Sequence, residues 1–90
     1  MGLHAEFVLT VPRPKNLGIA KMISDLTGAD KKCSGINLNS YYSNNTLEVS
    51  FNSSYILGFE FDTTIKHIVK MLNKLGESGF YIEVKRNWYF

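Results

Sequence analysis

Residues 59–90 read FEFDTTIKHIVKMLNKLGESGFYIEVKRNWYF, and the periods within this stretch predict the architecture of the domain. Between Asp62 and Gly76 apolar residues recur every three or four positions, which is the spacing of one face of an amphipathic helix. Asp62 is a suitable N-cap for this helix, and Gly76 is a suitable stop. On either side the sequence alternates in steps of two, which predicts strands over 55–61 and 80–90.

A strand and a helix are also predicted in the first third of the chain. Residues 5–11 alternate apolar and polar side chains, as expected of a strand with one face on a core. Residues 15–28 carry an apolar stripe with helical spacing, with Pro14 near its first turn and Gly28 as a stop. The stripe consists of Ile19, Met22, Ile23 and Leu26.

A three-stranded meander is predicted between the two helices. Strands over 36–42 and 46–52 flank the Asn-Asn pair 44–45, whose side chains tolerate the positive φ of a two-residue hairpin turn. The polar run 52–54 is predicted to form a second turn, which leads into the strand over 55–61.

The predicted order of elements is therefore β-α-β-β-β-α-β, which belongs to the α+β class. Two amphipathic helices need one shared apolar surface, so the simplest arrangement is a single two-layer domain over residues 1–90. It has two helices on one face of a mainly antiparallel sheet of about five strands, close to a split β-α-β arrangement with an added strand. The other sheet face is expected to be open.

Length and composition limit the class of protein. Ninety residues with 44% hydrophobic and 20% charged side chains are typical of one globular domain. So small a domain buries only about 60–65% of its unfolded surface, which makes a homodimer one hypothesis. The single Cys33 cannot form an internal disulfide, and the start of the sequence lacks a signal-peptide pattern, which favours the cytoplasm. No apolar run approaches the roughly 20 residues that span a bilayer, so no membrane association is expected.

Aligned strand pleats would separate the charges between the two sides of the domain. If Phe7, Val49, Phe59 and Ile82 point toward the helices, the residues that alternate with them lie on the open sheet face. These are Glu6, Tyr41, Glu48, Glu60, Tyr81, Glu83 and Tyr89. Tyrosine supplies rigid amphipathic contact area and glutamates steer toward basic surfaces, so this face predicts a protein partner. The same residues also suit a solvated face that resists aggregation, and both interpretations stay open.

The aromatic end of the chain, Trp88-Tyr89-Phe90, has two interpretations. In the first, Trp88 covers an open end of the core and the last strand pairs inside the sheet. In the second, this strand lies at an edge and pairs with another molecule. Trp88 and Tyr89 are therefore candidate protein-binding residues.

The lysines support a competing hypothesis, that the protein binds nucleic acid. A row on the second helix and a pair before the hairpin would make the helical side cationic; these residues are Lys31, Lys32, Lys66, Lys70 and Lys74. The formal net charge of +2 is mild for a dedicated nucleic-acid binder. Three phosphate contacts would give a salt slope of only about −3. We therefore rank this function below protein binding.

No residue pattern predicts catalysis, a metal site or a cofactor site. Cys33 follows two lysines that would favour its thiolate, but no histidine stands near it in the sequence. Glutamates spread over a sheet face are usually solvated rather than metal ligands. Acid/base pairs, nucleophile triads and phosphate-binding loops are absent from the sequence. We expect no enzyme activity.

The sequence thus favours a non-catalytic protein-interaction module that acts as a small regulator or inhibitor. Lysine outnumbers arginine eight to two, and asparagine is frequent. This bias is typical of AT-rich coding, as in many phages and low-GC bacteria. A phage-type inhibitor of a host factor is one form that such a regulator could take.

Overall fold

Across residues 3–29, 35–56 and 58–89, which the structure describes, a computed structural model of the protein shows four strands and two helices. The elements are β1 (Leu3–Pro12), α1 (Ile19–Thr27), β2 (Ile36–Ser43), β3 (Thr46–Ile56), α2 (Gly58–Lys74) and β4 (Tyr81–Tyr89). Neither helix in this part of the chain is long and apolar enough to cross a membrane.

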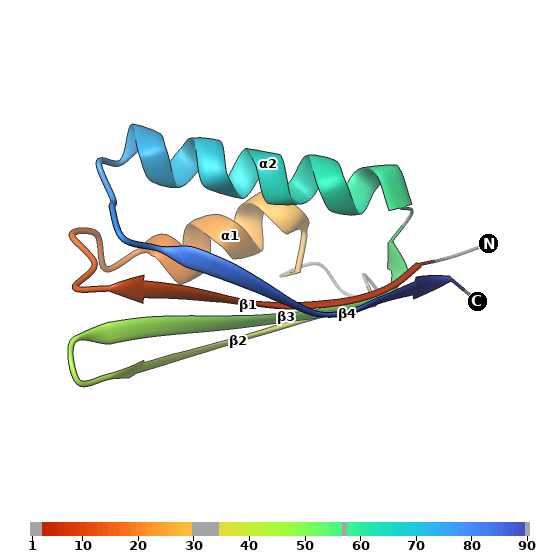
Figure 1. Ribbon diagram of the computed structural model, residues 1–90, viewed down its shortest axis with the longest axis horizontal. Coiled ribbons are helices and arrows are strands. Elements are labelled where there is room, and N and C mark those ends of the chain that lie inside the picture. The colour runs from red at the N-terminus through yellow and green to blue at the C-terminus, as the bar shows by residue number, and fades with distance from the viewer. Residues whose placement is uncertain (1–2, 30–34, 57, 90) are drawn as a thin grey trace.

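The strands form one antiparallel sheet in the order β2-β3-β1-β4, and both helices cover the same face of it (Figure 1). The connection through α1 joins β1 to β2 with β3 between them, and the connection through α2 joins β3 to β4 with β1 between them. This is the split β-α-β, or ferredoxin-like, arrangement. The α+β class and the two layers are confirmed, whereas the fifth strand is not found among the described residues.

The predicted turn at 52–54 is wrong, because β3 runs through this polar segment without a break. Ser53 pairs with Ala5 of β1 on one side and with Ile36 of β2 on the other. It is 1% exposed, so it occupies a core position that an apolar residue would normally fill. The small polar side chains of this strand therefore led to the prediction of a turn, because such residues are also typical of turns.

The strand predicted over 55–61 is wrong for a related reason. α2 begins at Gly58, and the predicted N-cap Asp62 lies inside it. Phe61 fits both periods, because it alternates with its neighbours and also stands four residues before Ile65 on the helical stripe. The helical position buries Phe61 to 3% exposure and brings its ring within 6.2 Å of the ring of Phe7.

The middle of the core is built on β1. Phe7 of β1 stacks on Phe51 of β3 with ring centroids 4.6 Å apart. The described side chains on one face of β1 are all buried, namely Ala5, Phe7, Leu9 and Val11. Val49 is buried on the same side of β3, so the predicted orientation of Phe7 and Val49 toward the helices is confirmed.

The predicted turns and helix stops are confirmed where glycine or asparagine marks them. Asn44 and Asn45 have φ of 53° and 60° and form the two-residue turn between β2 and β3. Gly76 has φ of 76°, and the N–H of Glu77 donates to the carbonyl of Leu72 over 3.0 Å, which closes α2 with a Schellman motif.

The predicted stripe of α1 is only half buried. Ile19 and Ile23 are completely buried, whereas Met22 and Leu26 are partly exposed. Leu26 lies on the side of this short helix that faces α2, as the depression that it shares with α2 residues shows. The contact between the helices therefore leaves part of the predicted apolar face in solvent.

A buried carboxylate fastens the segment between β1 and α1 to the end of α2. Glu77 is 5% exposed and accepts hydrogen bonds from the backbone N–H of Lys15 (2.9 and 3.0 Å) and of Asn16 (2.9 Å). The side-chain amide of Asn16 donates a further bond of 2.9 Å. Burial raises the pKa of Glu77, but these donors outweigh burial and the pKa is lowered overall.

Replacing Asn52 tests the continuity of β3. In a strand with neighbours on both sides every backbone N–H points at a partner strand, so Asn52→Pro should cost more than about 3 kcal/mol of unfolding free energy. Asn52→Thr keeps the N–H and should change stability by less than about 1 kcal/mol. Urea unfolding measures the unfolding free energy of both variants. A loss of less than about 1 kcal/mol for Asn52→Pro would contradict a continuous β3 and support the turn predicted at 52–54.

Replacing Glu77 tests the contact between the two loops. Glu77→Gln should destabilise the fold by about 1–3 kcal/mol, because its amide group then faces backbone donors. The folded pKa lies below the ordinary 4.5, so the stabilisation is present above that value and is lost as pH falls through the folded pKa. Between about pH 7 and about pH 3, the unfolding free energy should therefore fall more for the wild type than for Glu77→Gln. Equal losses would contradict this role.

Candidate functional site

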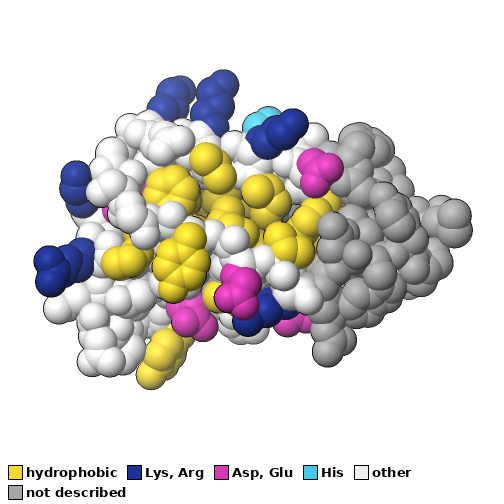
Figure 2. Space-filling model, in the orientation of Figure 1, with side chains coloured by type: hydrophobic (Ala, Val, Ile, Leu, Met, Phe, Trp, Pro, Cys, Tyr) yellow, Lys and Arg dark blue, Asp and Glu magenta, His cyan; other side chains and the backbone are white. Residues whose placement is uncertain are grey.

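The charges are distributed unevenly between the two layers. In Figure 2 most of the dark-blue cationic side chains lie outside the sheet face, and most acidic side chains lie on the sheet side with one cationic side chain among them. Lys66, Lys70 and Lys74 are exposed on successive turns of α2, as their spacing predicts. Lys31 and Lys32, the other lysines of the nucleic-acid hypothesis, lie outside the described residues, as does Cys33.

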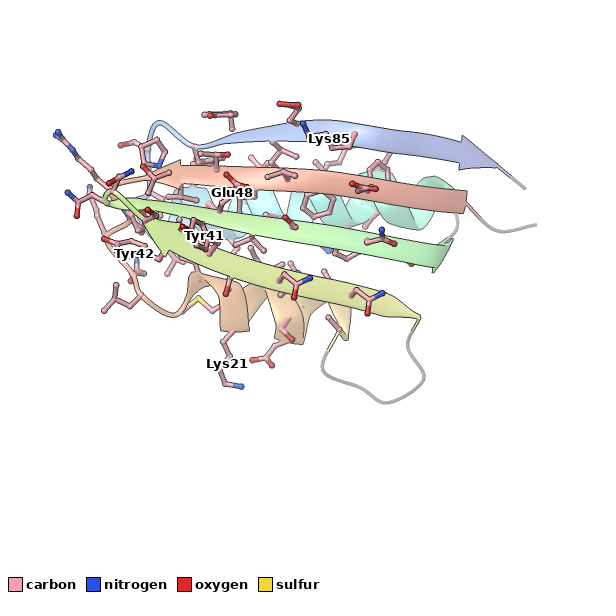
Figure 3. All side chains as sticks on the ribbon, turned by 90° about the horizontal axis from the view of Figure 1, so that it is seen from below. Lys21, Tyr41, Tyr42, Glu48 and Lys85 are labelled. Atoms are coloured by element: carbon pink, nitrogen blue, oxygen red, sulfur yellow. The ribbon has the colours of Figure 1, made fainter. Side chains whose placement is uncertain are left out.

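One row of residues crosses the uncovered face of the sheet, onto which Figure 3 looks. Tyr41, Glu48, Thr10 and Tyr81 are successive register partners on β2, β3, β1 and β4. Tyr41 is 68% exposed and Tyr81 is 57% exposed, so most of each phenol is available for contact. The row therefore carries a tyrosine at either edge of the sheet and a carboxylate between them.

Two more carboxylates share this face. Glu83 is the register partner of Val8, in the row next to the tyrosines, and Glu6 lies one row further along β1. The register thus brings together five of the predicted binding residues, namely Glu6, Tyr41, Glu48, Tyr81 and Glu83. Their role in binding stays a prediction.

A lysine lies among these acids. The Nζ of Lys85 donates a hydrogen bond to Glu83 on the same strand. This bond and the charge of Glu83 raise the pKa of Lys85, and the charges of Glu6 and Glu48 add to the effect. Lys85 therefore stays protonated and neutralises part of the negative charge of this face. The sequence could have indicated this lysine, because Lys85 lies in the strand predicted over 80–90 and two residues after Glu83.

Glu60 does not belong to the sheet face, which corrects the prediction. It lies in the first turn of α2 because residues 58–61 are helical rather than extended. The prediction placed Glu60 on the sheet face because it assumed a strand over 55–61, and residues 58–61 do not form a strand. The acidic face is therefore smaller than the sequence suggested.

β4 is an edge strand, and it contains a bulge. The register shifts by one residue at Lys85, which lies between the paired residues Val84 and Arg86. The bulge therefore interrupts the alternation of side chains that was predicted for this strand. The alternation no longer determines on which face of the sheet Trp88 and Tyr89 lie. The backbone of both residues pairs with β1, and their side chains lie outside the described part of the structure. A bulge and a lysine are both features that hinder pairing with a further strand.

The described residues contain no group of three or more His, Cys, Asp or Glu side chains that could hold a metal ion. His67 is exposed on α2.

Comparisons with known proteins inform the fold only. No protein-family model matches the chain. No curated protein matches it either. Among solved structures, the de novo designed protein Foldit4 is similar with a TM-score of 0.69 over 100% of this chain and 99% of that chain, at 15% sequence identity. At this identity the similarity shows a shared architecture.

Proposed function

We propose that this protein is a non-catalytic interaction module that binds a basic surface of another protein through its uncovered sheet face. The observation that supports this most is the row in which Tyr41, Glu48 and Tyr81 lie in register across the sheet. Exposed tyrosines are well suited to contact because they offer large rigid surfaces with little loss of side-chain entropy. The neighbouring carboxylates select a partner of opposite charge.

The sheet face suits a protein better than a nucleic acid. Sheets that bind single strands stack bases on aromatic side chains within a positively charged groove. Here the aromatic residues Tyr41 and Tyr81 share their face with Glu6, Glu48 and Glu83, which would repel phosphates. An acidic face of this kind could instead occupy the basic surface of a nucleic-acid-binding protein and act as a competitive inhibitor.

The sheet face is also a better candidate than pairing along the free edge of β4. The bulge and the lysine at Lys85 interrupt the edge where a partner strand would have to form its ladder. Strand addition at this edge would therefore lose hydrogen bonds in its middle. The predicted contribution of Trp88 and Tyr89 is then additional contact area beside the face.

The size of the face indicates the strength of the complex. Four strands about 4.8 Å apart and about eight residues long at about 3.3 Å per residue give a flat area on the order of 500 Å². A standard interface buries about 800 Å² on each partner. We therefore expect a transient regulatory complex unless the partner also covers an edge of the sheet.

Reversing two acids tests the proposal. Glu48→Lys with Glu83→Lys should weaken partner binding by at least about tenfold, because two attractive charges become repulsive. Stability should change by less than about 1 kcal/mol, because both residues are exposed. The wild type and the variant are used as bait in lysate of the source organism, with and without nuclease treatment. Bound proteins are identified by mass spectrometry, and the affinity for the identified partner is then measured by calorimetry.

The matched control is Asp25→Lys with Asp62→Lys, which changes the net charge equally but on the helices. This control should capture the same partner as the wild type. Equal capture by both variants would eliminate the sheet face. Capture that disappears after nuclease treatment would favour the nucleic-acid function of the lysine row.

A further inference from the structure

The helical layer covers the sheet unevenly. Phe7 of β1 pairs with Val84 of β4, and Leu9 pairs with Ile82, so the members of each pair lie on the same face of the sheet. Phe7 and Leu9 are completely buried on this face, whereas Val84 is 48% exposed and Ile82 is only partly buried. The cover that the helices provide therefore ends between β1 and β4.

The side of α2 that faces away from α1 borders this uncovered strip. On the α1 side, Met71 and Leu75 share a depression with Leu26. On the other side, Ile65 and Val69 are partly buried and line a second depression of about 590 Å³, which shares Lys70 and Lys74 with the first. Figure 2 shows a patch of hydrophobic side chains at this place, with cationic side chains above it and acidic side chains at its lower and right borders.

The border of the depression is cationic. Its lining includes Lys66, Lys70 and Lys74, together with the neutral Asn73, and no acidic residue. The three lysines are spaced four residues apart, which corresponds to steps of about 6 Å along the axis of α2. An elongated apolar surface with cations at this interval matches a helix that carries acids at the same spacing.

We propose that the depression along α2 lined by Ile65 and Val69, together with the strip of β4 that carries Ile82 and Val84, forms a groove that docks an amphipathic helix of another protein with acidic residues along one flank. The apolar face of that helix lies on the groove, as in other helix-in-groove complexes. Its acidic flank pairs with Lys66, Lys70 and Lys74. This site is separate from the sheet face, because the groove uses the helix side of β4 and the acidic face uses the opposite side.

A second copy of this chain does not fit the groove. Pairing α2 with α2 about a two-fold axis would bring the lysine rows of the two copies together. On α1 the exposed acid Asp25 already pairs with Lys21 over 3.7 Å, so this helix has no acidic flank. Apolar residues beside the lysines also make the groove a poor surface for a nucleic-acid backbone, which carries no apolar face to cover them.

The test uses a fluorescein-labelled peptide of about 18 residues, which as a helix is about 27 Å long and so matches α2. Its leucines are placed at positions i, i+3, i+4 and i+7, and glutamates flank them. A scrambled peptide of the same composition and a peptide with lysine in place of glutamate serve as controls. Fluorescence anisotropy is measured at about 50 and about 200 mM salt, because binding across exposed charges weakens with salt.

The acidic amphipathic peptide should bind at least about tenfold more tightly than the scrambled one. Exposed ion pairs each change affinity by a factor of about two to five, so Lys66→Glu with Lys70→Glu should weaken its binding by about tenfold. The same variant should now prefer the lysine peptide. Val84→Asp should weaken the binding of the acidic peptide only. In 15N spectra of the wild type, adding the acidic peptide should shift the amide signals of residues 65–74 and 80–84.

The matched control Lys15→Glu with Lys21→Glu removes one exposed lysine before α1 and one on α1, neither of which lines the groove. Equal weakening by the control and by the groove variant would overturn the proposal, because the attraction would then be unspecific. So would equal affinity for the acidic and scrambled peptides. Binding to phosphatidylglycerol vesicles without any preference among the peptides would assign the surface to lipid and overturn it as well.

Discussion

The whole structure depends on the pleat of β1. This strand pairs with β3 on one side and with β4 on the other, and Phe7 at its centre stacks on Phe51 and reaches Phe61 of α2. Because successive side chains of a strand point to opposite faces, a slip of one residue in β1 would exchange the core and solvent faces of its neighbours. The burial of Phe7 therefore also determines where Glu6 and Thr10 lie.

Two different surfaces follow from this one alternation. On the face without helices, in-register rows place tyrosines and carboxylates together across all the described strands. On the other face the helices bury residues 5, 7, 9 and 11 of β1 but leave Val84 of β4 exposed. β4 thus carries Tyr81 and Glu83 on the uncovered face and the exposed Val84 on the other. The charge separation that aligned pleats predict is accordingly a property of the layers, with exceptions on both sides: Lys85 on the sheet face, and Asp25 and Asp62 on the helices.

The sequence was sufficient to predict an element where the hydrophobic periodicity agreed with the turn and stop residues that bound it. The alternation of residues 5–11, the asparagine turn and the stop at Gly76 all led to correct elements. It was insufficient where one residue satisfied two patterns: Ser53 is small and polar yet fills a core position, and Phe61 suits a strand and a helix equally. Only the contacts of the folded chain decide such cases. The bulge at Lys85 and the bonds of Glu77 also depend on partners far apart in sequence, so local patterns could not reveal them.

The central claim is that one face of the sheet is bare and that its tyrosines stand on the side opposite the core. Relaxation enhancement by a neutral, soluble gadolinium chelate measures this directly on the aromatic ring protons of the free protein. The account predicts strong enhancement at Tyr41 and Tyr81 and almost none at Phe7 and Phe51. Rings of Tyr41 and Tyr81 that are as protected as the ring of Phe51 would contradict it, because the proposed binding face would then be covered.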